Sequence, residues 1–160
     1  MEFVLIVGAD NSGKSTLVRS LTGLGRGSHQ HASGRNIAEL SWVASVRPLK
    51  TFCLISSLNE TPKIIPPADL EAILNQYELI GCAKAILCIS TSVNSPGMTV
   101  EDYFNQLQGP NLGRHTLTHV CRLRGALSVV PSGVAVVDVP HALQTRNNVA
   151  AYVRQGIGLR

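Results

Sequence analysis

The chain has 160 residues, a length typical of one domain, and we treat residues 1–160 as a single domain. Hydrophobic residues make up 44% of the chain and charged residues only 15%, a balance that excludes a largely disordered protein. The formal net charge is +4, and no apolar run is long enough to predict a membrane span. Four cysteines without Cys-x-x-Cys spacing, and an apolar start without a basic leader, predict a cytoplasmic protein with reduced thiols.

The positive charge is concentrated in the C-terminal third. Residues 1–102 carry eight basic and nine acidic side chains, whereas residues 103–160 carry six arginines and one acid. Arginine suits phosphate groups and nucleic-acid backbones, so this third is compatible with docking onto DNA or RNA. It is equally compatible with a basic tail on an ordinary domain, and an aromatic content of 4% argues against a base-stacking platform.

Apolar runs and segments of helical spacing alternate along the chain. The expected strands cover residues 3–7, 36–46, 50–57, 84–90 and 134–139. The expected helices cover residues 14–24, 69–80, a segment opening at Thr99 with Asp102 as its capping partner, 115–124 and 146–155. This alternation predicts an α/β domain of three layers around a mostly parallel central sheet.

One motif stands above the background, directly after the first expected strand. It reads Gly8-Ala9-Asp10-Asn11-Ser12-Gly13-Lys14-Ser15 and fits G-x-x-x-x-G-K-[ST] at every fixed position. The glycines let the backbone curl so that N–H groups point at phosphate oxygens, and the following helix N-terminus adds a partial positive charge. We therefore expect residues 8–16 to bind nucleotide phosphates. Lys14 would reach the β- and γ-phosphates, Ser15 would ligate Mg²⁺, and Thr16 would help bind the α-phosphate.

In this motif the chain resembles the P-loop NTPases, whose phosphate loop is the Walker A sequence. Residues 8–23 are similar to the opening of small Ras-like and translation-factor-related GTPases, and the order of elements through about residue 108 is similar as well. The resemblance implies a three-layer P-loop NTPase fold that binds GTP or ATP with Mg²⁺ and hydrolyses it. Some members use an asparagine at the position of Asn11 to help bind potassium.

The chain departs from these GTPases in two motifs. After the third strand, where they carry Asp-x-x-Gly, this chain has Ser56-Ser57-Leu58-Asn59-Glu60. The guanine-reading Asn/Thr-Lys-x-Asp motif has no match here, and the nearest position is Asp138-Val139-Pro140-His141. GTP and ATP therefore both stay open as the nucleotide.

The remaining chemistry needs an acid near the metal and a cation near the transferred phosphoryl group. Asp138 ends an apolar strand and Glu60 follows the strand over 50–57, so either carboxylate could reach the site. We assign Asp138, with Ser15, to the metal, and Glu60, Arg35 and Lys14 to catalysis. The alternative for the two acids is a strand-end or capping role, and for Arg35 a solvated surface. Asp10 is expected to face solvent or a partner.

These observations favour a Mg²⁺-dependent nucleoside triphosphatase that acts as a switch or regulator, with slow hydrolysis stimulated by a protein partner. One alternative is a nucleotide-binding module without turnover that assembles with another subunit or a further copy of the chain. Another is a small-molecule or nucleoside kinase with a lid built from residues 109–130.

Overall fold

A computed structural model describes residues 1–23, 41–46, 49–59, 64–92, 98–107, 109–124, 130–139 and 146–159. Most of the strands and helices that the sequence predicts are present in these residues, but three strands follow the third helix without a helix between them. The strands are β1 (Glu2–Gly8), β2 (Ser41–Val46), β3 (Leu49–Ser57), β4 (Lys84–Ser90), β5 (Asn111–Leu112), β6 (His115–Leu123) and β7 (Ala135–Val139). The helices are α1 (Lys14–Thr22), α2 (Pro67–Leu79), α3 (Val100–Gln106) and α4 (Arg146–Gly156).

The strands form one mixed sheet in the order β2-β3-β4-β1-β6-β5, with β7 also paired to β6. The pairs β3–β4, β4–β1, β1–β6 and β6–β7 are parallel, whereas β2–β3 and β5–β6 are antiparallel. β1 therefore has a parallel neighbour on each side, and β4 separates it from β3. This order brings the carboxyl ends of β4 and β6 next to the carboxyl end of β1.

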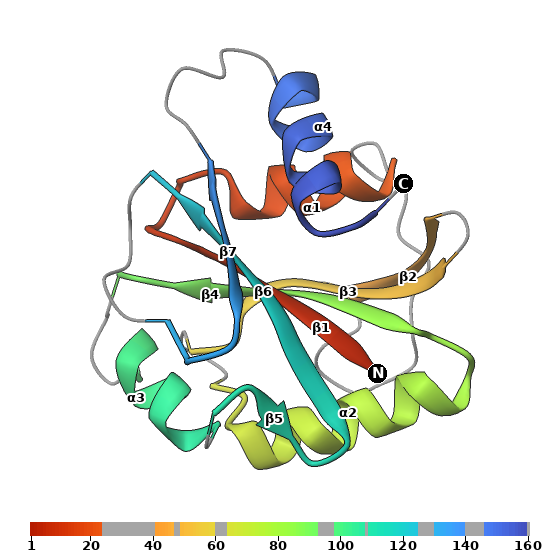
Figure 1. Ribbon diagram of the computed structural model, residues 1–160, viewed down its shortest axis with the longest axis vertical. Helices are drawn as coiled ribbons and strands as arrows, with labels where there is room; N and C mark the ends of the chain where they lie inside the picture. The colour runs from red at the N-terminus through yellow and green to blue at the C-terminus, as the bar shows by residue number, and fades with distance from the viewer. Residues whose placement is uncertain are drawn as a thin grey trace.

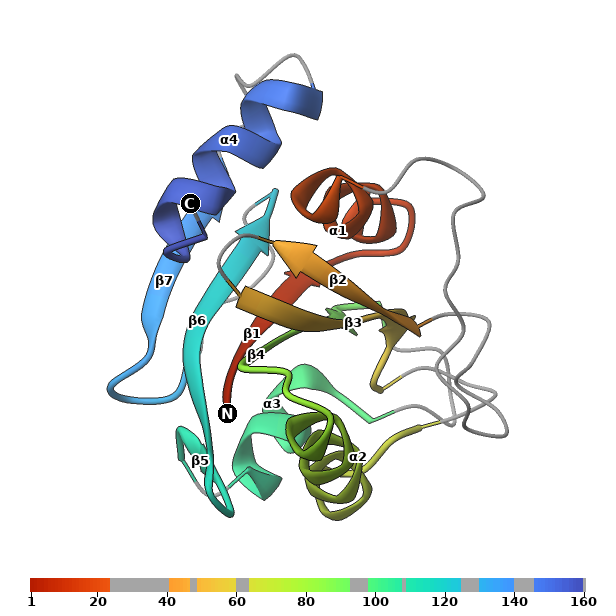
Figure 2. The same ribbon diagram turned by 90° about the vertical axis from the view of Figure 1, so that its right-hand side faces the viewer.

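Two helical layers cover the two faces of the sheet (Figures 1 and 2). Phe3, Leu5 and Val7 of β1 pack with α2 and α3, whereas Val4 and Ile6 pack with α1 and α4. Because both faces of β1 are buried, its sequence is an unbroken apolar run rather than an alternating one. The structure is thus an α/β fold of three layers.

Local signals set the helix boundaries. α2 begins at Pro67, where a missing N–H costs no helical hydrogen bond. At the start of α3, Thr99 Oγ1 accepts a hydrogen bond from the Asp102 N–H at 3.0 Å and donates one to Asp102 Oδ2 at 2.6 Å. α1 ends at Gly23, whose φ of 72° is the left-handed conformation that glycine adopts readily.

The helix expected over residues 115–124 is wrong, because these residues form the strand β6. Leu117 and Val120 pack on the α2 and α3 side of the sheet, whereas Cys121 and Leu123 pack on the α1 and α4 side. A strand buried on both faces has apolar residues at spacings that also suit a helix, so the pattern alone does not separate the two. Residues 109–124 are therefore part of the sheet and its edge, which contradicts a lid over this part of the predicted 109–130 segment.

The other expected elements are confirmed to within a few residues where the structure describes them. The strand expected from residue 36 begins in the described part at Ser41, and residues 36–40 lie outside that part. The helix expected over 69–80 covers Pro67–Leu79, and the strand expected over 84–90 has those bounds.

The described cysteines are free thiols in the interior. Cys53, Cys88 and Cys121 lie in the cluster between the sheet and the α1 and α4 layer. Burial raises the pKa of Cys53 well above its usual value and that of Cys121 to about 12. Protonated, buried thiols behave as small hydrophobic side chains and are poor nucleophiles.

Replacing Leu5 by alanine is expected to remove about 2–5 kcal/mol from the free energy of unfolding, because it leaves a cavity under the central strand. Leu5 is fully buried, whereas Val136 of β7 is 41% exposed. Val136→Ala is the control and is expected to change stability by no more than about 0.5 kcal/mol. Urea unfolding at equilibrium measures both, and equal losses for the two variants would contradict this packing.

The folded protein is expected to resist a thiol reagent at about pH 8 and to react at all its cysteines once unfolded in guanidinium. An unfolded thiol ionises near pH 9.0, below the raised pKa of the buried Cys121. Stability is therefore expected to be retained below about pH 9 and to fall as the pH rises above it, as denaturation at stepped pH would measure. Rapid reaction of the folded protein would contradict the buried placement.

Candidate functional site

The loop that joins β1 to α1, residues 8–15, is called here the glycine-rich loop. It leaves the sheet at Gly8, and its backbone turns back through positive φ at Asn11 (59°) and Gly13 (95°). The Ser12 N–H donates to the Ala9 carbonyl at 3.2 Å, and the Leu17 N–H donates to the Gly13 carbonyl at 2.9 Å. The loop thus forms a tight turn that ends at the N-terminus of a helix.

Gly8 is required by the close packing of the loop on its own first residue. A Cβ at Gly8 would collide with Ser12 Oγ and would lie 3.1 Å from Leu123 Cβ at the end of β6. Ser12 Oγ is itself buried and has no hydrogen-bond partner among the described residues. A buried polar atom in this position is poised to bind an added polar group, because leaving it unsatisfied is unfavourable.

The ammonium group of Lys14 lies over the loop. Lys14 is 8% exposed, and its Nζ donates to the carbonyl oxygens of Gly8 at 2.8 Å and Ala9 at 2.9 Å. These two carbonyls accept hydrogen bonds from two of the three ammonium protons. Because the carbonyls are neutral, they do not cancel the positive charge of Lys14. The charge lies within a few residues of the N-terminus of α1, which carries the positive end of the helix dipole.

The first turn of α1 has no acidic residue, and its N-cap is Gly13, which has no side chain that accepts a hydrogen bond. The side chain of Ser15 is exposed, and among the described residues its hydroxyl donates only a long hydrogen bond, 3.5 Å, to the Ile55 carbonyl of β3. Thr16 follows in the same turn and is half-buried. The structure therefore brings the predicted residues 8–16 together around one helix N-terminus.

The end of β4 is fastened to the glycine-rich loop. The Asp10 N–H donates to Ser92 Oγ at 3.0 Å, and the Ser90 hydroxyl donates to Asp10 Oδ1 at 2.8 Å. In the backbone, the Thr91 N–H donates to the Gly8 carbonyl at 3.2 Å. Asp10 is exposed, as expected, but its carboxylate is also held by a neighbouring strand. Sequence reasoning did not identify Ser90 and Ser92, because nothing local indicates that β4 lies beside β1.

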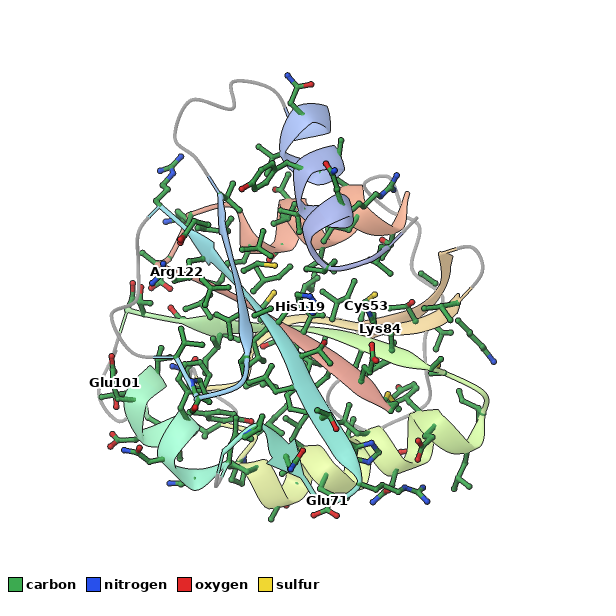
Figure 3. All side chains as sticks on the ribbon, in the orientation of Figure 1. Cys53, Glu71, Lys84, Glu101, His119 and Arg122 are labelled. Atoms are coloured by element: carbon green, nitrogen blue, oxygen red, sulfur yellow. The ribbon has the colours of Figure 1, made fainter. Side chains whose placement is uncertain are left out.

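The carboxylate of Asp138 is held by Arg122. The two form a bidentate pair between adjacent strands, with Nε–Oδ1 and Nη2–Oδ2 distances of 2.6 Å, and the hydrogen bonds from Arg122 lower the pKa of Asp138. Arg122 is paired with Val7, one residue before the loop, and lies at that end of β6 (Figure 3). The strand β6 lies between Asp138 and β1. To hold a metal beside the glycine-rich loop, Asp138 would have to release or share its hydrogen bonds with Arg122.

Two predicted catalytic residues, Glu60 and Arg35, lie outside the described residues. Glu60 falls in the gap between Asn59, just after β3, and Ile64, and Arg35 falls in the gap between residues 23 and 41. Their predicted roles therefore stay predictions.

Three arginines of the C-terminal third that the structure describes have partners within the fold. Arg114 Nε lies 2.7 Å from Glu78 Oε2, and Arg122 is paired with Asp138. The guanidinium of Arg154 donates to the carbonyls of Ser20 and Leu21 at distances of 2.8–3.1 Å, which ties α4 to the C-terminal end of α1. These three side chains have structural partners, which weakens the case for nucleic-acid docking through them.

Comparison of the chain with known protein families, with curated proteins and with solved structures found no match in any of the three. Within the described ranges, no helix is long and apolar enough to cross a membrane. The same ranges contain no group of three or more His, Cys, Asp or Glu side chains arranged to hold a metal ion. The case for function therefore rests on the loop.

Asp138→Asn is expected to reduce the free energy of unfolding by at most about 1 kcal/mol near neutral pH, because the pair with Arg122 is largely exposed. The pKa of Asp138 is lowered in the folded state, so the stabilisation is present above its unfolded pKa of 3.8 and is lost as the pH falls. The difference between the two proteins in urea unfolding is expected to shrink as the pH falls below 3.8, and to shrink in about 1 M salt. A loss that is the same in all conditions would contradict an ionic role.

Proposed function

We propose that the glycine-rich loop binds the phosphates of GTP or ATP together with Mg²⁺. On this proposal the protein is a small P-loop NTPase that hydrolyses its nucleotide slowly and acts as a switch or regulator. The observation that carries the proposal is the position of a complete G-x-x-x-x-G-K-[ST] motif. It lies between the carboxyl end of a central parallel strand and a helix N-terminus, with the lysine folded over the loop.

The loop offers an anion several favourable groups at one place. The N-terminus of α1 supplies backbone N–H groups and a partial positive charge, and Lys14 supplies a full charge in a mostly buried position. A phosphate oxygen can replace the carbonyls of Gly8 and Ala9 as the partner of the Lys14 ammonium, which exchanges a dipole for a charge. Hydrogen bonds between charged partners are the stronger kind.

The residues of the loop also suit Mg²⁺, an ion that prefers oxygen ligands and is held by few protein groups beside phosphates. The exposed Ser15 hydroxyl, whose hydrogen bond to the Ile55 carbonyl is long, would hold the ion. When bound, the ion would supply positive charge that neutralises the charge developing on the nucleotide phosphates. Glu60 and Asp138 are the proposed acids that would complete its surroundings.

A nucleotide-binding module without turnover is the second candidate. Two carboxylates near this edge of the sheet already have partners, since Asp10 is held by Ser90 and Asp138 by Arg122. A carboxylate engaged in this way is a poor activator of water. This candidate agrees with a protein that binds nucleotide in order to assemble with a subunit or with another copy of itself.

Lys14→Ala is expected to weaken binding of Mg·GTP and Mg·ATP at least about tenfold, since a hydrogen bond to a charged group contributes about 1.5–3 kcal/mol. Titration of fluorescent GTP and ATP measures the affinity, and phosphate release is followed in the same samples. Lys14→Gln keeps the chain length without the charge and separates loss of binding from loss of folding. Lys50→Ala, at an exposed lysine in the first part of β3, is the matched control.

Unchanged affinity of both Lys14 variants would contradict the proposal. Binding with phosphate release supports a hydrolase, and a preference for GTP or ATP identifies the base that is read. Binding without release supports the module without turnover.

A further inference from the structure

The hydroxyl of Ser90 joins the glycine-rich loop to the end of β4. It is fully buried, donates to Asp10 Oδ1 at 2.8 Å and accepts from the Ser92 N–H at 3.2 Å. The Ser92 hydroxyl in turn accepts from the Asp10 N–H. Because both the donor and the acceptor of the Ser90 hydroxyl are used, its orientation is set. Asp10 is thus bound through its side chain to the last residue of β4, Ser90, and through its backbone N–H to Ser92, two residues further on.

The backbone of Ser90 is held on its other side by Asn59, which follows β3 and is 2% exposed. The Ser90 N–H donates to Asn59 Oδ1 at 2.8 Å, and Asn59 Nδ2 donates to the Ser90 carbonyl at 2.7 Å. This is a reciprocal pair between one side chain and one backbone residue. It secures the ends of β3 and β4 at a place where their pairing is irregular.

Asn59 also fixes the approach to α3. Its Nδ2 donates a second hydrogen bond to the Met98 carbonyl at 2.9 Å, and the Met98 N–H lies 3.4 Å from the Asn59 carbonyl oxygen. Met98 directly precedes Thr99, the N-cap of α3. The Asn59 amide therefore donates both of its N–H groups to the carbonyls of Ser90 and Met98, and its oxygen accepts from the Ser90 N–H.

The resulting chain of hydrogen bonds runs from Asp10 through Ser90 and Asn59 to Met98. Its members come from four separate segments, and its two inner residues are buried. Displacement of Asp10 therefore removes the acceptor of the Ser90 hydroxyl and changes the surroundings of the Asn59 amide, which is bonded to the Ser90 backbone. A buried polar network is unfavourable when only part of its hydrogen bonds are made, so a change at the Asp10–Ser90 bond is expected to affect Asn59 as well.

We propose that Ser90 and Asn59 are positioning residues that couple the phosphate site of the glycine-rich loop to the placement of α3. The inference rests on the proposed function, because the effector is the nucleotide bound at the loop. Phosphate bound beside Asp10 repels its carboxylate and alters its hydrogen bond to Ser90. The altered position of Ser90 changes its hydrogen bonds with Asn59, and through the Asn59–Met98 hydrogen bond the position of the start of α3. Since coupling is reciprocal, a contact that alters α3 changes nucleotide affinity by the same factor.

The test is hydrogen–deuterium exchange over residues 98–107 with and without a non-hydrolysable Mg·GTP or Mg·ATP analogue. In the wild-type protein, bound analogue is expected to change the exchange rate there by about fivefold, the lower end of ordinary coupling. Ser90→Ala removes one hydroxyl and is expected to abolish this change while the analogue still binds. Ser90→Thr restores the hydroxyl and is expected to restore the change. Rescue of this kind is not expected of a residue that only fills space.

Thr118→Ala is the matched control. Thr118 of β6 also donates its hydroxyl to a backbone carbonyl, that of Phe3 at 3.3 Å, but it is not part of the chain from Asp10 to Met98. This variant is expected to keep the wild-type response. Asn59→Ala tests the second positioning residue, and Ser90→Ala carries the test if that buried substitution unfolds the protein.

The outcomes separate the two proposals. A response at residues 98–107 that is lost in Ser90→Ala and kept in Thr118→Ala supports the coupling. Binding of the analogue with no response there, or with a response that Ser90→Ala retains, overturns the coupling and leaves the proposed function intact. Failure of the wild-type protein to bind either analogue overturns both.

Discussion

The arrangement of this protein depends on β1 lying between two parallel strands with both of its faces buried. A parallel neighbour on each side requires that β4, β1 and β6 all end at the same edge of the sheet. The chain must leave this crowded edge at Gly8, where no side chain fits between Ser12 and Leu123. The tight loop, the start of α1 and the ends of the flanking strands are therefore forced together, and the features that bear on function lie there.

Charge at this edge is arranged in an uneven way. The ammonium of Lys14 is mostly buried and bound to carbonyl dipoles, whereas the carboxylates of Asp10 and Asp138 have hydroxyl and guanidinium partners. Lys14 is thus held by neutral carbonyls, whereas the two carboxylates are held by hydrogen-bond donors. Such an edge favours an added anion, because the anion gains a charged partner, and within the described part of the chain no ion pair of Lys14 has to break first.

The fold was predictable where one local pattern decides. The apolar run of β1, the glycine-rich motif and the Thr99 cap each depend on neighbours within a few residues, and the structure has them as expected. The strand β6 was not predictable from the sequence, because its burial on both faces gives apolar spacings that also suit a helix. Only its pairing with β1 shows that it is a strand.

The residues that contact the glycine-rich loop could not be predicted from the sequence, for a related reason. Ser90 bonds to a residue 80 positions away, and Asn59 bonds to residues 31 and 39 positions away. These contacts follow from the position of β4 between β1 and β3, which no local pattern encodes. Asp138 was singled out by its place at the end of an apolar run, but its partner Arg122 follows from the pairing of β7 with β6.

The most direct measurement of the central claim is a crystal structure with Mg²⁺ and a non-hydrolysable analogue of GTP or ATP. The account requires the terminal phosphates to lie within hydrogen-bond distance of backbone N–H groups at the start of α1. It also requires Lys14 Nζ to have moved from the carbonyls of Gly8 and Ala9 to phosphate oxygens. An analogue bound elsewhere, with Lys14 still on those two carbonyls, would contradict the account.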